Sequence, residues 1–346
     1  MPDVISFGML GCGEIAVQTA RSIDQAEHAR IALVQDVVEA PARDLGETHG
    51  ARWTLDAGDV FADPEVNVVY IAAPHYLHAP LAIQAMEAGK HALVEKPMAT
   101  TVEDCDRMIA AAQTNNVALS LAFVRRYSDG TIRARELVQQ GALGEIYGIY
   151  TSALGDKPAS YWKGGYSGRV PTTWRESKAQ AGGGILIMNL VHNLDALRWV
   201  TGLEAESIYS QYGTFVTPVE VEDFLSAVVR YRGGAVGTIE CGSAIPGRGA
   251  GGDRIYGTHG QIVFGRNLRV YTRREDVGLT PNEWQDLEPD EYWGMNSRTA
   301  LVEDLSRHLL QGKTPPIVGA DGRAVQALIC GAYQSGETGQ PVRLSG

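Results

Sequence analysis

A glycine-rich turn near the start of the chain has the residue types that hold a phosphate group. Residues 11–16 read G-x-G-x-x-A, between an apolar run that predicts a strand and a stretch that predicts a helix. Gly11 permits a tight turn, Gly13 lets a pyrophosphate approach the backbone, and Ala16 permits close packing of helix on strand. The first amides of the helix then face the phosphates. From this turn we predict that Gly11, Gly13, Glu14 and Ile15 contact a bound dinucleotide.

An acidic residue at the end of the next predicted strand indicates which dinucleotide is bound. Asp36 lies near the end of the apolar run 31–37. A carboxylate there accepts hydrogen bonds from the adenosine ribose hydroxyls and repels a 2′-phosphate. The following Val37 and Val38 supply no cation to neutralise one. The sequence therefore predicts NAD as the cofactor in preference to NADP.

The elements that must position this turn alternate regularly over the first 122 residues. Apolar runs predict strands at 4–10, 31–37, 67–73, 91–94 and 117–123, with helices predicted between them at 15–24, 42–49, 77–88 and 102–115. This alternation indicates an α/β domain with a parallel sheet and helices on both faces, at residues 1–122. We expect it to be a Rossmann dinucleotide-binding domain.

The pattern changes in the second half of the chain. A helix is predicted at 130–140, an irregular insertion at 155–181 and a helix at 184–201, and the tail is predicted helical at 299–311 and 323–337. Strands joined by turn signals are predicted at 146–152, 207–216, 224–232, 235–243, 253–257, 261–264 and 268–272. We expect residues 123–346 to form an α+β domain for substrate binding and oligomerisation, with an open, mostly antiparallel sheet.

Charge and cysteine usage exclude several classes of partner. The net charge of −11 disfavours nucleic acid and anionic membranes. No apolar stretch approaches the roughly 20 residues that span a bilayer, and we expect no secretory signal, because no basic start followed by a long apolar run is present in the first residues. The four cysteines form no C-x-x-C pair, so we expect no metal site, free thiols and a cytoplasmic protein.

Several further motifs together resemble one family. The triplet E-K-P stands at 95–97, A-A-P-H-Y-L-H at 72–78 and E-A-G-K-H at 87–91. Three glycines at 182–184 precede His192 and Asp195, and G-A-Y-Q-S at 331–335 is followed by G-Q-P-V at 339–342. These motifs resemble the glucose–fructose oxidoreductase / inositol dehydrogenase (Gfo/Idh/MocA) family over almost the whole chain. The resemblance implies an NAD-dependent dehydrogenase of a sugar, inositol or related polyol.

Oxidation of a secondary alcohol needs a hydride acceptor, a base for the hydroxyl proton and a group that stabilises the developing alkoxide. The resemblance implies Lys96 and His192 for the last two tasks. Lys96 follows a parallel strand, where open α/β sheets present their ligands. A nearby nicotinium cation tends to lower the pKa of a lysine, and histidine titrates near neutrality. The resemblance also implies that Pro97 fixes the approach of the lysine, often through a cis bond.

The remaining candidate residues surround these two. The candidates for cofactor contact, beyond the glycine-rich turn and Asp36, are Ala73, Pro74, His78, Glu95, Lys96, Trp174 and Arg175. The candidates for substrate contact are Lys96, Arg126, Tyr161, Trp162, Lys178, Asn189, His192 and Asp195. Structural roles remain open: a fixed histidine for His78, an ion pair for Arg126, and a packed loop or an oligomer contact for the residues of the insertion.

One departure from the family keeps another function open. Where relatives commonly carry Asp or Asn four residues before the histidine, this chain has Met188, followed by Asn189. This departure keeps a redox-neutral, NAD-dependent glycoside hydrolase as an alternative to the dehydrogenase. A non-catalytic sensor of NAD or sugar, as a few family members are, is a third alternative, against which the presence of both Lys96 and His192 argues. We expect a homodimer or homotetramer, because the exposed face of an open sheet favours association.

Overall fold

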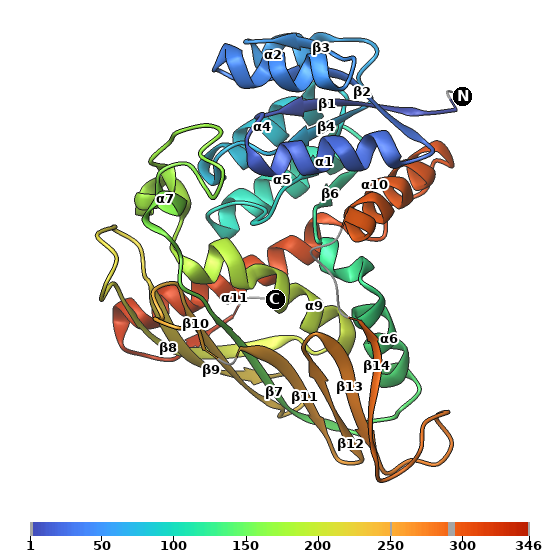
Figure 1. Ribbon diagram of the computed structural model, residues 1–346, viewed down its shortest axis with the longest axis vertical. Helices are drawn as coiled ribbons and strands as arrows, with labels where there is room; N and C mark the ends of the chain where they lie inside the picture. The colour runs from blue at the N-terminus through green and yellow to red at the C-terminus, as the bar shows by residue number, and fades with distance from the viewer. Residues whose placement is uncertain (1–2, 250, 290–294, 345–346) are drawn as a thin grey trace. The chain divides into compact units, whose positions relative to one another are not determined.

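The computed structural model describes residues 3–249, 251–289 and 295–344 (Figure 1). The chain divides into two compact units, each described below by itself. The first comprises Met1–Phe123, Pro158–Gly182 and Met295–Gln326. The second comprises Val124–Lys157, Gly183–Gly294 and Ala327–Gly346.

The first unit is built on a parallel sheet in the order β3-β2-β1-β4-β5-β6. The strands are β1 Ile5–Leu10, β2 Ala29–Gln35, β3 Arg52–Thr54, β4 Val68–Ile71, β5 His91–Val94 and β6 Leu119–Leu121. The helices between them are α1 Glu14–Gln25, α2 Glu39–Thr48, α3 Ala57–Ala62, α4 His75–Glu87 and α5 Val102–Thr114. Every residue of β1 and β4 is buried, as expected for central strands covered on both faces. The predicted doubly wound α/β architecture is confirmed.

Segments from later in the chain complete this unit. Short helices α7 Ala159–Trp162, η2 Trp174–Glu176 and α8 Lys178–Ala181 belong to it, as do α10 Met295–Leu310 and the first residues of α11 Gly319–Thr338. Helix α10 packs against α1, β1 and β2. The predicted domain boundary between residues 122 and 123 stays a prediction. Residues 158–182 and 295–326 pack with the first unit, although they come after that boundary in the chain. Among the described residues, no helix combines the length and the apolar sequence needed to cross a membrane.

The second unit contains a sheet in the order β14-β13-β12-β11-β7-β10-β9-β8-β15. Its strands are β7 Ile146–Leu154, β8 Ala205–Gly213, β9 Phe224–Tyr231, β10 Val236–Gly242, β11 Gly252–Gly257, β12 Gly260–Phe264, β13 Asn267–Thr272, β14 Trp284–Pro289 and β15 Val342–Arg343. Strands β7 and β10 pair in parallel and the other described pairs are antiparallel, which confirms the predicted mostly antiparallel sheet. Burial alternates along β9, so one face is covered and the other is exposed.

The helices of the second unit are η1 Val124–Tyr127, α6 Asp129–Gln139, η3 Leu186–Leu190 and α9 Val191–Thr201, with the rest of α11. The helix predicted over 184–201 is therefore one π-helical turn followed by a regular helix. Such π turns within helices are rare and often occur at functional sites. Helix α9 packs against α6 and β7, which places its residues beside the central part of the sheet.

A buried ion pair attaches α10 to the end of β5. Oε1 of Glu95 lies 2.8 Å from the Tyr70 hydroxyl and 2.8 Å from Nη1 of Arg298, and all three side chains are buried. Burial alone would raise the pKa of Glu95, but the charges of Arg298 and Lys96 and the hydrogen bonds outweigh it and lower that pKa. The carboxylate therefore stays ionised in the core, and Arg298 neutralises it.

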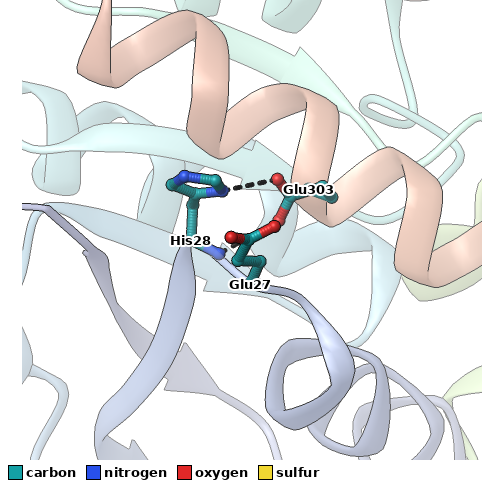
Figure 2. A group of neighbouring side chains, drawn as sticks. All are labelled: Glu27, His28 and Glu303. Atoms are coloured by element: carbon teal, nitrogen blue, oxygen red, sulfur yellow. Dashed lines mark hydrogen bonds and ion pairs between the residues drawn. The ribbon is translucent and has the colours of Figure 1, made fainter.

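A second contact of α10 involves three residues that could in principle ligate a metal (Figure 2). Glu303 accepts from both the ring Nδ1 of His28, at 2.6 Å, and the backbone amide of His28, at 3.0 Å. The carboxylate of Glu27 completes a group whose ligand-type atoms lie within 4.8 Å of one another. Because hydrogen bonds account for the His28–Glu303 geometry and Glu27 is exposed, we assign the group to the packing of α10 against the start of β2.

Replacement of Arg298 by methionine should destabilise the first unit strongly. Arg298→Met leaves the Glu95 carboxylate buried without its cation, which typically costs about 3–5 kcal/mol of unfolding free energy. Urea denaturation followed by circular dichroism measures the loss. The control is Arg323→Met, which breaks the more exposed ion pair with Asp106 and should cost about 1 kcal/mol or less. Equal losses in the two variants would contradict the assigned role of the buried pair.

Candidate active site

The glycine-rich turn has the geometry that its sequence predicts. Gly11 has φ +89°, and a Cβ placed there would lie 2.9 Å from the carbonyl oxygen of Ala72, so the fold itself requires glycine. Gly13 precedes α1 with φ −71°, and a Cβ placed there would meet no atom within 4 Å. The fold therefore does not explain the second glycine, and open space remains where a pyrophosphate would approach.

Asp36 holds this turn against the end of β2. Its Oδ2 accepts from the backbone amide of Cys12 at 2.8 Å, and its Oδ1 accepts from that of Val38 at 2.9 Å. The side chain is buried, and each oxygen keeps a lone pair for a further donor. Burial, assisted by the charge of Asp36, raises the pKa of the Cys12 thiol to about 12, so this cysteine stays protonated and unreactive.

A buried histidine joins the loops that follow β4 and β5. Nδ1 of His78 lies 2.7 Å from the carbonyl oxygen of Pro97, and Nε2 lies 2.9 Å from that of Ala73. Lys96 is half-buried at the carboxyl end of β5, and its peptide bond to Pro97 is cis. The structure thus brings Ala73, His78 and Lys96 together at the edge of the sheet where the glycine-rich turn also lies. Glu95, one residue earlier, points into the core.

The irregular insertion adds an aromatic cluster to the first unit. The ring centroids of His75 and Trp174 lie 4.4 Å apart, and His75 Nδ1 lies 2.8 Å from the carbonyl oxygen of Ala181. The Arg175 guanidinium lies 4.5 Å from the Trp174 ring centroid and 5.3 Å from that of Tyr161. Burial places the pKa of His75 well below its usual value, so its ring is neutral at pH 7.

The predicted residues of the insertion therefore differ in accessibility. Tyr161 and Trp162 are buried, Trp174 and Arg175 are half-buried, and Lys178 is exposed at the start of α8. Because Trp174 packs on His75 at the start of α4, the pair Trp174–Arg175 lies beside the loop that carries Ala73 and Pro74.

In the second unit, a buried carboxylate fixes the helix that carries His192. Glu222 accepts from the amides of Gly184 at 2.5 Å and Leu186 at 3.0 Å, and from the Tyr333 hydroxyl at 2.9 Å. Burial raises the pKa of Glu222, although these three donors oppose the shift. A Cβ at Gly184 would lie 2.0 Å from the carbonyl oxygen of Glu222, and one at Gly183 would lie 2.2 Å from the Tyr333 hydroxyl. Packing thus explains these two glycines.

His192 and Asp195 are both buried on α9. Asp195 forms a two-point ion pair with Arg126, with Nε to Oδ2 at 2.8 Å and Nη2 to Oδ1 at 2.5 Å. This pair gives Arg126 and Asp195 a structural role, and the contact of either with substrate stays a prediction.

A cavity of about 340 Å³ opens beside this helix, entirely within the second unit. Its polar lining comprises Arg125, Ser152, Lys157, Asn189, Asn193 and Asp253. Asp253 accepts from Nη1 of Arg125 at 2.5 Å and from Nδ2 of Asn193 at 3.0 Å. The Ser152 hydroxyl is buried and has no hydrogen-bond partner among the described residues. A cavity of this size, with amide, hydroxyl and charged groups, suits a small polyhydroxylated molecule.

The sequence singled out Asn189 of this lining and missed the other five residues. Asn193 follows His192 directly, and Arg125 precedes Arg126, so both were close to predicted positions. Asp253 lies far away in the sequence and reaches the cavity through the pairing of β11 with β7. No local pattern indicates such a contact.

Two family models match this chain. One, described as an oxidoreductase family with an NAD-binding Rossmann fold, matches residues 5–123, and the other, the GFO/IDH/MocA C-terminal domain, matches residues 131–263. Levoglucosan dehydrogenase of Pseudarthrobacter phenanthrenivorans is 31% identical over 65% of this chain and 60% of that protein. Myo-inositol 2-dehydrogenase of Thermotoga maritima is 25% identical over 98% of both chains.

Solved structures share the whole architecture. A levoglucosan dehydrogenase in complex with NADH and levoglucosan superposes with a TM-score of 0.88 at 24% identity, over 99% of this chain and 100% of the other. An aldose-aldose oxidoreductase from Caulobacter crescentus, complexed with glycerol, gives a TM-score of 0.84 at 27% identity, over 99% and 100% of the two chains. The predicted fold, family and NAD-binding Rossmann domain are confirmed. The chain belongs to the Gfo/Idh/MocA family of oxidoreductases.

Proposed function

We propose that this protein transfers a hydride between NAD and a secondary hydroxyl of a sugar, inositol or related polyol. The observation that carries the proposal is the pair of sites described above. One unit has a dinucleotide turn with open space in front of Gly13, and the other has a polar cavity beside the helix of His192. Relatives named levoglucosan dehydrogenase and myo-inositol 2-dehydrogenase support this substrate class.

The residues of the first unit have distinct tasks in this proposal. Gly13 and the amides of Glu14 and Ile15 hold the pyrophosphate, while Asp36 accepts from the adenosine ribose. Ala73, Pro74, His78, Trp174 and Arg175 form the nicotinamide side of the site. NAD, when bound, supplies the hydride acceptor. Glu95 acts through the orientation of Lys96, because its carboxylate is buried against Arg298.

Lys96 and His192 act on the substrate hydroxyl. The Lys96 ammonium stabilises the oxygen as it becomes an alkoxide, and His192 takes the proton. In the reverse direction, His192 returns the proton to the oxygen of the ketone. Asn189, with Asn193 and Lys157 of the cavity, contacts the other hydroxyls. The predicted contacts of Arg126, Tyr161, Trp162, Lys178 and Asp195 with substrate are retained as secondary candidates.

We further propose a cytoplasmic homodimer or homotetramer. Tyr209, Val228 and Val236 are exposed large apolar side chains on one face of the sheet of the second unit, and Tyr209 pairs directly with Val228 across β8 and β9. Such an exposed sheet face favours association with a second copy. All four cysteines are free thiols, and three of them are buried, in keeping with a reducing compartment.

Replacement of Gly13 by alanine should separate binding from folding. Because no atom lies within 4 Å of the added methyl group and φ is negative, the midpoint of thermal unfolding should be unchanged or slightly higher. The dissociation constant for NADH should rise about tenfold or more, because the methyl group occupies the approach of the pyrophosphate. Fluorescence titration and calorimetry measure the two effects. Gly11→Ala is the contrasting variant, which should lose thermal stability as well as NADH affinity. Normal NADH affinity in Gly13→Ala would contradict the proposed pyrophosphate site.

The reaction itself is tested with NAD⁺ and a panel of pyranoses, inositols, sugar acids and aryl glycosides, followed at 340 nm. We expect one class to produce NADH. Lys96→Met and His192→Asn should each lower kcat/KM by about 10²–10⁴-fold, with NADH binding retained. Lys313→Met, a surface substitution, is the control. Release of aglycone without NADH would establish the redox-neutral hydrolase instead, and binding without turnover would indicate a sensor.

A further inference from the structure

The insertion of the first unit crosses the dinucleotide turn at two points. The first point is Glu14, the opening residue of α1. Its Oε2 accepts from the backbone amide of Tyr166 at 3.1 Å. A Cβ on Gly165 would lie 2.6 Å from the same oxygen, and Gly165 has φ +79°. The left-handed backbone conformation at Gly165 favours glycine, and a side chain there would also displace the Glu14 carboxylate.

The second point is Arg169, whose guanidinium reaches three acceptors around the turn. Nε donates to the carbonyl oxygen of Cys12 at 2.8 Å, and Nη2 donates to Asp44 Oδ2 at 2.6 Å and to the carbonyl oxygen of Pro41 at 3.3 Å. Its side chain is about three-quarters buried, with 24% of its surface exposed. Arg169 thus connects the insertion to both the turn after β1 and helix α2.

These contacts are made at the edge through which a dinucleotide has to pass. Cys12 lies between the two glycines of the turn, and its amide is the group held by Asp36. A pyrophosphate approaches Gly13 and the start of α1, and the adenosine ribose approaches Asp36. A segment attached to Cys12 on one side and to Glu14 on the other therefore lies beside both halves of the adenosine diphosphate position.

We propose that residues 165–169 form a strap that retains the bound dinucleotide, with Arg169 as the residue that fastens it. The inference rests on the proposed use of NAD and goes beyond it, because it assigns the rate of cofactor release to a segment outside the glycine-rich turn. Release requires the strap to move, and movement breaks the contacts of Arg169 with Cys12 and Asp44. The guanidinium also places a positive charge beside Asp44 and the carbonyl oxygen of Cys12, near the turn where a diphosphate adds negative charge.

The experiment measures NADH release directly. The enzyme–NADH complex is mixed with excess NAD⁺ in a stopped-flow instrument, and the decay of bound NADH fluorescence gives the dissociation rate. Arg169→Ala should increase this rate about tenfold or more, because it removes charge-assisted hydrogen bonds on one end of the strap. Asp44→Ala, which leaves the contact with Cys12, should give a smaller increase. Arg43→Ala is the matched control, because Arg43 lies on the same helix and forms its ion pair with Glu39, away from the strap.

The outcomes separate the strap from the proposed function. A wild-type protein that does not bind NADH overturns both. Normal NADH binding with an unchanged dissociation rate in both Arg169→Ala and Asp44→Ala overturns the strap alone. A tighter complex in Arg169→Ala also overturns it, because the segment would then obstruct the site instead of retaining the ligand. The measurement needs no substrate, so a silent sugar panel does not affect its interpretation.

Discussion

The buried ion pair between Glu95 and Arg298 is the interaction on which the candidate active-site edge of the first unit depends. A carboxylate in the core is unfavourable unless a cation accompanies it, and the cation comes from α10, roughly two hundred residues later in the chain. The pair fixes the end of β5, and Lys96 is the next residue. The chain must therefore return to its first unit after it has formed strands β7 to β14 of the second. The position of Lys96 therefore depends on the neutralisation of the Glu95 carboxylate by Arg298.

The second unit also places a buried carboxylate against the segment that carries the other candidate residue, but satisfies it differently. Glu222 is buried, and it accepts hydrogen bonds from two backbone amides at the start of a helix and from one tyrosine hydroxyl. A carboxylate at this end of a helix also interacts favourably with the helix dipole. His192 lies on the same helix, beyond the π-helical turn that exposes Asn189 to the cavity. Each proposed catalytic group is therefore held by a buried acid that does not itself react.

The sequence predicts those parts of the structure that have a local signal. The turn at 11–16, the alternation of strands and helices, and the acidic residue at 36 need only neighbouring residues to be interpretable. The return of α10 to the first unit, the parallel pairing of β7 with β10, and the reach of Asp253 into the cavity depend on contacts between distant segments. The strands at 52–54 and 284–289 were missed because they are too short, or too polar, to show a period, whereas the short strand at 342–343 was indicated only by the family resemblance of residues 339–342. Arg169 has no motif at all, and its role emerges only from its contacts.

Retention of the dinucleotide bears on which reaction the site performs. A dehydrogenase that exchanges its cofactor in each turnover is limited by the slowest of chemistry and release, and a strap over the site slows release. A redox-neutral reaction has no such limit, because the hydride returns to the substrate before the cofactor needs to leave. The buried Met188, where relatives commonly carry a polar residue, removes one group that could relay a proton from His192 to solvent. The strap and Met188 therefore both affect whether the reaction ends in net oxidation or in return of the hydride to the substrate. The strap acts through the time for which the cofactor stays bound. Met188 acts through the path by which the proton leaves His192.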